Sequence, residues 1–76
     1  MKSIFVRDLT EERDNPTFDV VYQSAPGEWR YSEDVYYTEG EAISAAEILR
    51  AENNFPDWWE ATAHLSGDGV RVICEV

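Results

Sequence analysis

Hydrophobic and polar residues alternate along the first part of the chain, a pattern typical of strands that bury one face. Residues 3–9 (SIFVRDL) predict a first strand, and residues 18–24 (FDVVYQS) predict a second. In the second strand Phe18, Val20 and Tyr22 share one face. The stretch between the two strands, TEERDNPT, predicts a charged connection with an Asn-Pro turn signal.

A third strand is predicted at residues 29–37 (WRYSEDVYY), after a Pro-Gly turn. Four aromatic rings and three carboxylates crowd into the stretch from Gly27 to Tyr37, so the two faces of this strand should differ sharply. We expect the odd-numbered positions to face the core and the other face to meet solvent, with Glu33 as the exception. The inward set is Trp29, Tyr31, Val35 and Tyr37, and the outward set is Arg30, Ser32, Asp34 and Tyr36.

The pattern then changes to helical spacing, and a helix is predicted from Glu39 to about Asn53. Thr38 is the expected N-cap, with Glu41 placed to reach back to the Thr38 amide in a capping box. Asn53 tolerates left-handed backbone, and Pro56 prevents the helix from continuing. The expected contact stripe is formed by Ala42, Ala45, Ala46 and Leu49, flanked by Ile43 and Ile48.

Two further strands are predicted, at residues 58–65 (WWEATAHL) and 70–76 (VRVICEV). The SGDG sequence between them is a strong hairpin signal, so we expect these two strands to pair with each other. The inward positions are expected to be Trp59, Ala61, Ala63 and Leu65 in one strand and Val70, Val72, Cys74 and Val76 in the other.

These elements predict a single α+β domain over residues 1–76. The expected fold is a mostly antiparallel five-stranded sheet, in the order β-β-β-α-β-β along the chain, with one helix packed on one face. Because one helix covers only one face, the other should be an interface with a partner or with a second copy of the chain. The uncovered face is expected to hold Arg30, Asp34, Tyr36, Trp58, Glu60, Thr62, His64, Arg71, Ile73 and Glu75.

Charge is the outlying property of the composition. The 76 residues include 16 Asp and Glu but only six Lys and Arg, which gives a net charge of −10. This excess argues against nucleic acid or an anionic membrane as a direct partner, since both are polyanions. It favours a basic protein surface as a partner, or serves solubility alone. Cys74 is the only cysteine, and no stretch approaches the roughly 20 apolar residues of a membrane span, so we expect a cytoplasmic protein.

Candidate catalytic and metal-binding groups are few. If residues 58–65 and 70–76 form a hairpin, His64 and Cys74 point to opposite faces of the sheet and cannot work as a nucleophile and its base. One histidine and one cysteine do not supply a zinc site, and no phosphate-binding glycine loop is present. We therefore expect a protein that is not an enzyme and that has no metal or other cofactor.

The acids recur along every predicted segment instead of forming one block. Carboxylates held at intervals over a rigid surface resemble the charge pattern of a nucleic-acid backbone, and such a surface could occupy a Lys/Arg channel built for DNA or RNA. Interspersed aromatic side chains would anchor the complex, and either Tyr36 or Trp58 is the expected anchor. The expected acidic contacts are Glu33, Asp34, Glu39, Glu41 and Glu47.

In size, acidity and order of elements the chain resembles the small phage-encoded inhibitors of bacterial defence, of which anti-CRISPR proteins are the best-known group. The resemblance is architectural and compositional, and it carries no functional residues over. It implies inhibition by binding, either by blocking target DNA binding to a CRISPR–Cas complex or by blocking nuclease recruitment. The alternative is a homodimeric structural, assembly or regulatory protein whose acidic surface serves only solubility.

Overall fold

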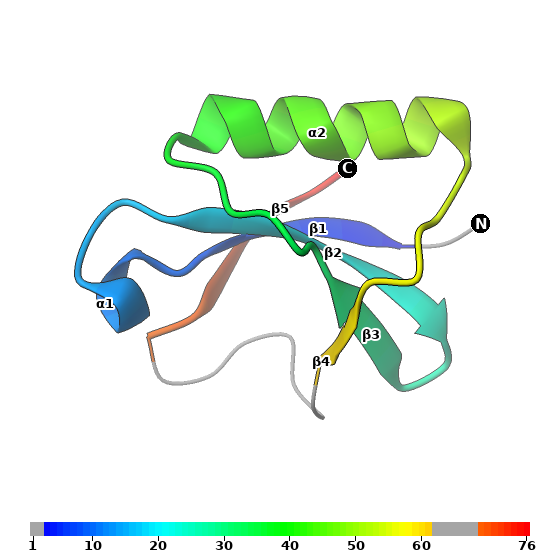
Figure 1. The fold of residues 1–76 in the computed structure, drawn as a ribbon, viewed down its shortest axis with the longest axis horizontal. Coiled ribbons are helices and arrows are strands. Elements are labelled where there is room, and N and C mark those ends of the chain that lie inside the picture. Colours follow the sequence, from blue (N-terminus) through cyan, green and yellow to red (C-terminus); the bar gives the residue numbers. More distant parts are fainter. Residues whose placement is uncertain (1–2, 62–68) are drawn as a thin grey trace.

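The computed structural model describes residues 3–61 and 69–76 and shows the predicted α+β fold (Figure 1). A five-stranded antiparallel sheet carries one long helix, and a second, short helix follows the first strand. That short helix occupies part of the stretch predicted to be only a charged connection. The elements are β1 (Ile4–Asp8), α1 (Thr10–Arg13), β2 (Phe18–Ala25), β3 (Glu28–Tyr31), α2 (Glu39–Glu52), β4 (Trp59–Ala61) and β5 (Arg71–Glu75).

The strand order is β4-β3-β2-β1-β5, so the last two strands lie at opposite edges of the sheet. The predicted hairpin between residues 58–65 and 70–76 is therefore wrong. β4 pairs with β3, and β5 pairs with the free side of β1 through Phe5–Glu75 and Val6–Cys74. A turn signal reports only local backbone preference, and it does not decide which strand offers a long-range partner. Residues 62–68, which include Thr62, His64 and Leu65, lie outside the described residues.

Helix α2 lies across one face of the sheet, and the core fills the space between them (Figure 1). Its predicted contact residues Ala42, Ala46 and Leu49 are buried. The small side chains of the two alanines let the helix approach large residues of the sheet closely. Ile48, predicted at the flank of the stripe, is 58% exposed. The fully packed cluster consists of Ile4, Val6, Val20 and Tyr22 from the sheet and Ala42, Ala46 and Leu49 from the helix.

Both ends of α2 are capped by the predicted residues. The Thr38 hydroxyl accepts a hydrogen bond from the Glu41 amide at 3.2 Å, and it donates one to the Glu41 carboxylate at 3.1 Å. Glu41 thus reaches the Thr38 side chain and not, as predicted, its amide. Asn53 adopts the left-handed conformation at the other end, and its N–H donates to the Leu49 carbonyl at 3.0 Å.

The two faces of the third strand are the reverse of the prediction. The register pairs Tyr22 with Arg30 and Gln23 with Trp29. Because paired residues on neighbouring strands point to the same face, Arg30 lies on the side of α2 with Tyr22. Trp29 and Tyr31 therefore lie on the face away from the helix.

The third strand also ends earlier than predicted, at Tyr31. Ser32 accepts a hydrogen bond from the Val20 amide at 3.2 Å and donates one to the Asp34 carbonyl at 2.7 Å, which bends the chain out of the sheet. Beyond this bend only Tyr36 returns, in an isolated bridge with Phe18. Residues 33–41 therefore connect the end of β3 to the start of α2 (Figure 1).

Three hydrophobic residues predicted on the uncovered face pack against the core on the helix side instead: Tyr36, Trp58 and Ile73. Ile73 does so at an irregularity of register, because β5 pairs Cys74 with Val6 and Val72 with Arg7, leaving one extra residue between them. The same register places Val72, predicted inward, opposite Arg7 on the face away from α2. Tyr37, also predicted inward, is 65% exposed.

Candidate functional site

The surface of the described residues is dominated by carboxylates. Of the 15 Asp and Glu residues in 3–61 and 69–76, 13 are exposed. The other two, Asp8 and Asp19, are held by arginines of the protein itself, at 3.1 Å from Arg71 and 2.7 Å from Arg7. Two of the arginines are thus paired with carboxylates of the protein itself, and the charge exposed at the surface is strongly negative.

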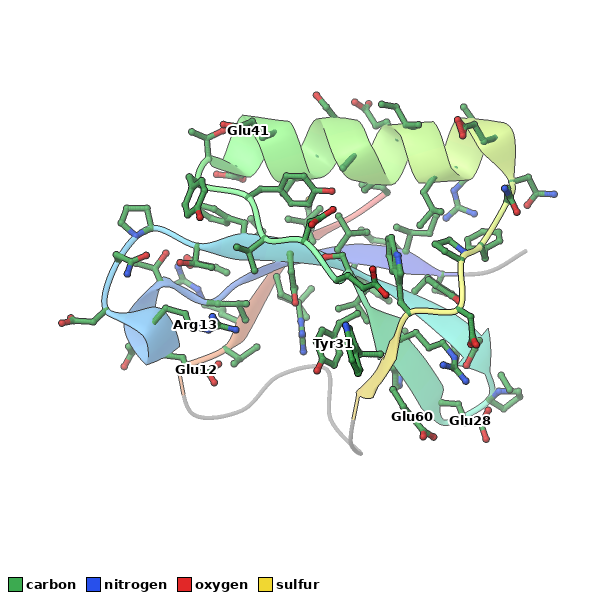
Figure 2. The ribbon with its side chains drawn as sticks, in the orientation of Figure 1. Glu12, Arg13, Glu28, Tyr31, Glu41 and Glu60 are labelled. Atoms are coloured by element: carbon green, nitrogen blue, oxygen red, sulfur yellow. The ribbon has the colours of Figure 1, made fainter. Side chains whose placement is uncertain are left out.

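Acidic residues gather where the chain passes from β3 to α2. We call residues 33–41 the acidic strip, because Glu33, Asp34, Glu39 and Glu41 are all exposed there, together with Tyr37. Figure 2 shows Glu41 at the first turn of α2, projecting away from the sheet. Carboxylates in the first helical turn also meet the positive end of the helix dipole, which favours their charge.

The strip has a defined conformation because hydrogen bonds hold it at both ends. At one end the Ser32 side chain fixes the bend after β3, and at the other the Thr38 side chain caps α2. Between them the Tyr36 amide donates to the Phe18 carbonyl at 2.8 Å, and the Phe18 amide donates to the Tyr36 carbonyl at 2.7 Å. The carboxylates therefore project from a supported backbone, so little backbone entropy remains to be lost in any contact that they make.

The remaining predicted contacts lie apart from the strip or beneath the surface. Glu47 is exposed on α2, two turns beyond Glu39. Trp58 packs on Tyr22 with ring centroids 5.6 Å apart, and its carbonyl accepts a hydrogen bond from Arg30 at 2.6 Å. Tyr36 is half-buried, and burial followed by the charge of Asp34 raises the pKa of its hydroxyl. The packing of Tyr36 and Trp58 gives both rings a role in the core.

Two other aromatic residues, both predicted to face inward, are exposed and are candidate anchors that the sequence analysis missed. Tyr37 lies within the acidic strip, and Trp59 begins β4 with 59% of its surface exposed. Adjacent residues of a strand face opposite sides, so once Trp58 packs inward, Trp59 must point outward. The adjacent pair Trp58–Trp59 therefore predicts one buried and one exposed ring. Only the strand register shows which of the two rings is exposed.

The face of the sheet away from α2 carries an ion pair that packs against aromatic rings. Arg7 forms two hydrogen bonds with Asp19, and its guanidinium carbon lies 5.7 Å from the centre of the Tyr31 ring. Beside them Phe5 meets Trp29 edge to face, with ring centroids 5.5 Å apart. The centre of this face is therefore packed, and its exposed aromatic surface is concentrated at Trp59.

A shallow cleft lies between α1 and β5, lined by Asp8, Thr10, Glu11, Gly69, Val70 and Arg71. Hydrogen bonds from Thr10, and then Arg71, hold the pKa of the Asp8 carboxyl below its usual value. At the opposite end of β5, burial and the nearby charge of Glu39 raise the pKa of the Cys74 thiol, which favours its unreactive protonated form. His64 lies outside the described residues, and because β4 and β5 do not pair, the hairpin argument for its separation from Cys74 no longer applies.

No three His, Cys, Asp or Glu side chains gather as a metal site within residues 3–61 and 69–76. In the same part of the chain, no helix has the length and apolar character needed to cross a bilayer. No protein-family model, curated protein or solved structure matches this chain. Within the described residues, the features that bear on function are the acidic strip, which includes the exposed ring of Tyr37, and the exposed ring of Trp59.

Proposed function

We propose that this protein is a non-enzymatic inhibitor that binds a basic nucleic-acid-binding surface of a bacterial defence complex. The observation that carries the proposal is the acidic strip, in which four exposed carboxylates project from a backbone fixed by Ser32 and Thr38. A surface of this charge attracts a Lys/Arg groove from a distance and then occupies the positions of phosphate groups.

The resemblance to anti-CRISPR proteins directs the proposal to a CRISPR–Cas complex in the cytoplasm of a bacterial host. Binding there would block the entry of target DNA or the recruitment of a nuclease. The negative charge of the protein speeds its association with a basic groove, whereas packing contacts at the centre of the interface determine how long the complex lasts.

The direct test is competition between this protein and target DNA on purified CRISPR–Cas surveillance complexes, at two salt concentrations. We expect the wild-type protein to reduce DNA binding, and added salt to weaken the inhibition. The double variant Glu33→Lys/Asp34→Lys should bind about ten-fold more weakly, mainly through slower association.

The matched control is Glu12→Lys/Glu52→Lys, which changes the net charge by the same amount at exposed sites outside the strip. Glu52 lies at the far end of α2, about 20 Å along the helix from Glu39. We expect this variant to keep most of the inhibition. Equal losses of inhibition in the two double variants would show that total charge matters and the strip does not. If the wild-type protein does not inhibit DNA binding, a CRISPR–Cas complex is ruled out as the target.

A homodimer is the second candidate function, and it is favoured by the exposure of Trp59 at a sheet edge. In that case the acids serve solubility, and the exposed ring meets its copy across a two-fold axis. Sedimentation would then show a dimer that Trp59→Glu dissociates and that Glu33→Lys/Asp34→Lys leaves intact. A monomer at high protein concentration would exclude this reading.

A further inference from the structure

Trp59 combines large exposed area with a fixed position. It is the first residue of β4, it pairs with Tyr31 across the ladder, and 59% of its surface is exposed. Among the described residues β4 pairs only with β3, so Trp59 stands at an edge of the sheet. Tryptophan is among the residues most often found at the energetic centre of protein interfaces, and an exposed one on a rigid strand is ready to bind without reorganisation.

Trp59 lies close to acidic residues in the chain and in the strand pairing, although its ring and the Glu28 and Glu60 side chains lie on opposite faces of the sheet. Tyr31, its partner in the ladder, lies two residues before Glu33, the first residue of the acidic strip. On the opposite face of the same two strands, Glu60 pairs with Arg30 and Glu28 lies two residues from Arg30. Figure 2 shows Glu28 and Glu60 projecting at this edge.

Little positive charge opposes these acids. Arg30 is bonded to the Trp58 carbonyl and lies 3.0 Å from Asp57, so its charge is already engaged by the protein. An exposed indole on a protein with a net charge of −10 favours a cation, because the ring face is negative and the charge of the protein adds to its potential. The same charges repel the phosphates of a nucleic acid and argue against a stacked base as the occupant.

The protein already contains the contact that such a surface would make. Arg7 lies over the Tyr31 ring at 5.7 Å while Asp19 holds its guanidinium with two hydrogen bonds. Arginine, ring and carboxylate are thus combined once inside the fold, next to Trp59 in the ladder.

We propose that Trp59 binds an arginine side chain of the partner, whose guanidinium stacks on the indole in the negative field of this acidic protein. The inference rests on the proposed function and specifies its partner as an arginine-bearing segment of the basic groove. Arginine is selected over lysine because its flat, weakly hydrated guanidinium stacks on an aromatic face more favourably than a compact ammonium does.

The test measures binding of nona-arginine and nona-lysine peptides by calorimetry at one salt concentration. The peptides carry the same charge, so an acidic surface alone would treat them similarly. We expect the wild-type protein to bind nona-arginine about two- to five-fold more tightly. Trp59→Leu should remove that preference, Trp59→Phe should keep part of it, and Ile48→Ala, at an exposed hydrophobic side chain of α2 outside the strip, should leave it unchanged.

The outcomes separate this inference from the proposed function. If Trp59→Leu keeps the arginine preference, Trp59 is not the arginine site, and the acidic-strip proposal stands provided that Glu33→Lys/Asp34→Lys weakens both peptides. If that double variant weakens neither peptide, the acidic-strip proposal fails. A dimer that Trp59→Leu dissociates would overturn the arginine site and assign the ring to self-association. Circular dichroism on each variant ensures that only folded proteins are compared.

Discussion

Arg7 and Asp19 face each other across β1 and β2 and form an ion pair with two hydrogen bonds. The distances are 2.9 Å from Arg7 Nε to Asp19 Oδ1 and 2.7 Å from Nη2 to Oδ2. Only 2% of the Asp19 side chain and 11% of the Arg7 side chain are exposed. Two charges removed from water in this way are tolerable only together, because each compensates the desolvation of the other.

Removing one member of this pair should therefore destabilise the protein strongly. We expect Asp19→Ala to lower the free energy of unfolding by about 3–5 kcal/mol, since it leaves the Arg7 charge buried without a partner. Urea denaturation followed by circular dichroism measures the change. The control is Asp57→Ala, which removes an exposed pair with Arg30 and should cost less than about 1 kcal/mol. Similar losses in the two variants would mean that the buried pair has no special role.

The helix could be predicted from the sequence because its signals are local. Thr38 and Asn53 mark its ends through their own backbone and side-chain preferences, and the alanines between them define its contact stripe. The face of the third strand could not be predicted in the same way. Alternation shows that Trp29 and Arg30 point to opposite sides, but the pairing of Arg30 with Tyr22 decides which side meets the helix.

The same distinction applies to the candidate site. The exposure of Glu33, Asp34 and the helix acids follows from the cost of burying charge, so their surface position was predictable. Which tryptophan is exposed was not predictable, because the exposures of Trp58 and Trp59 are exchanged if the opposite face of the strand packs against the helix. The partner of β5 was also beyond local reasoning, since its pairing with β1 joins residues from the two ends of the chain.

Gly69 and Gly27 offer a matched test of a contact between α1 and the start of β5. Both have φ of +78°, so alanine would be strained equally at each. A Cβ at Gly69 would lie 2.9 Å from the Glu12 backbone nitrogen, whereas one at Gly27 meets nothing within 4 Å. We expect Gly27→Ala to cost about 1–2 kcal/mol from backbone strain alone and Gly69→Ala to cost more.

Thermal or urea denaturation of both glycine variants measures this difference. The additional loss in Gly69→Ala reports the approach of α1, whose Glu12 amide donates to the Gly69 carbonyl at 3.3 Å. If the two variants lose equal stability, α1 can shift to accommodate the added methyl group at little cost. Its contact with Gly69 then contributes little to the stability of the fold.

Asp8 should make stability depend on pH at the acid end. Its pKa is lowered from 3.8 in the folded protein, mainly by hydrogen bonds from Thr10. The folded state therefore disfavours protonation relative to the unfolded chain, so the stabilisation is present above pH 3.8 and is lost as pH falls through the folded pKa. Thr10→Val removes the largest cause, and we expect it to raise the pKa of Asp8. Carboxyl NMR titration measures that pKa directly, and an unchanged value would contradict the assigned cause.

Glu39 and Glu52 occupy opposite ends of α2, which separates the effect of the helix dipole from that of net charge. Both are exposed glutamates, and Lys at either site relieves the same two units of negative charge. At Glu52 the new cation meets the negative end of the helix, so Glu52→Lys should stabilise the protein by about 0.3–1 kcal/mol. At Glu39 the cation meets the positive end, so Glu39→Lys should give little gain or a loss. Urea denaturation at low salt measures both changes, and added salt should shrink the gap between them. Equal stabilisation by the two variants would mean that relief of overall repulsion outweighs the dipole in this protein.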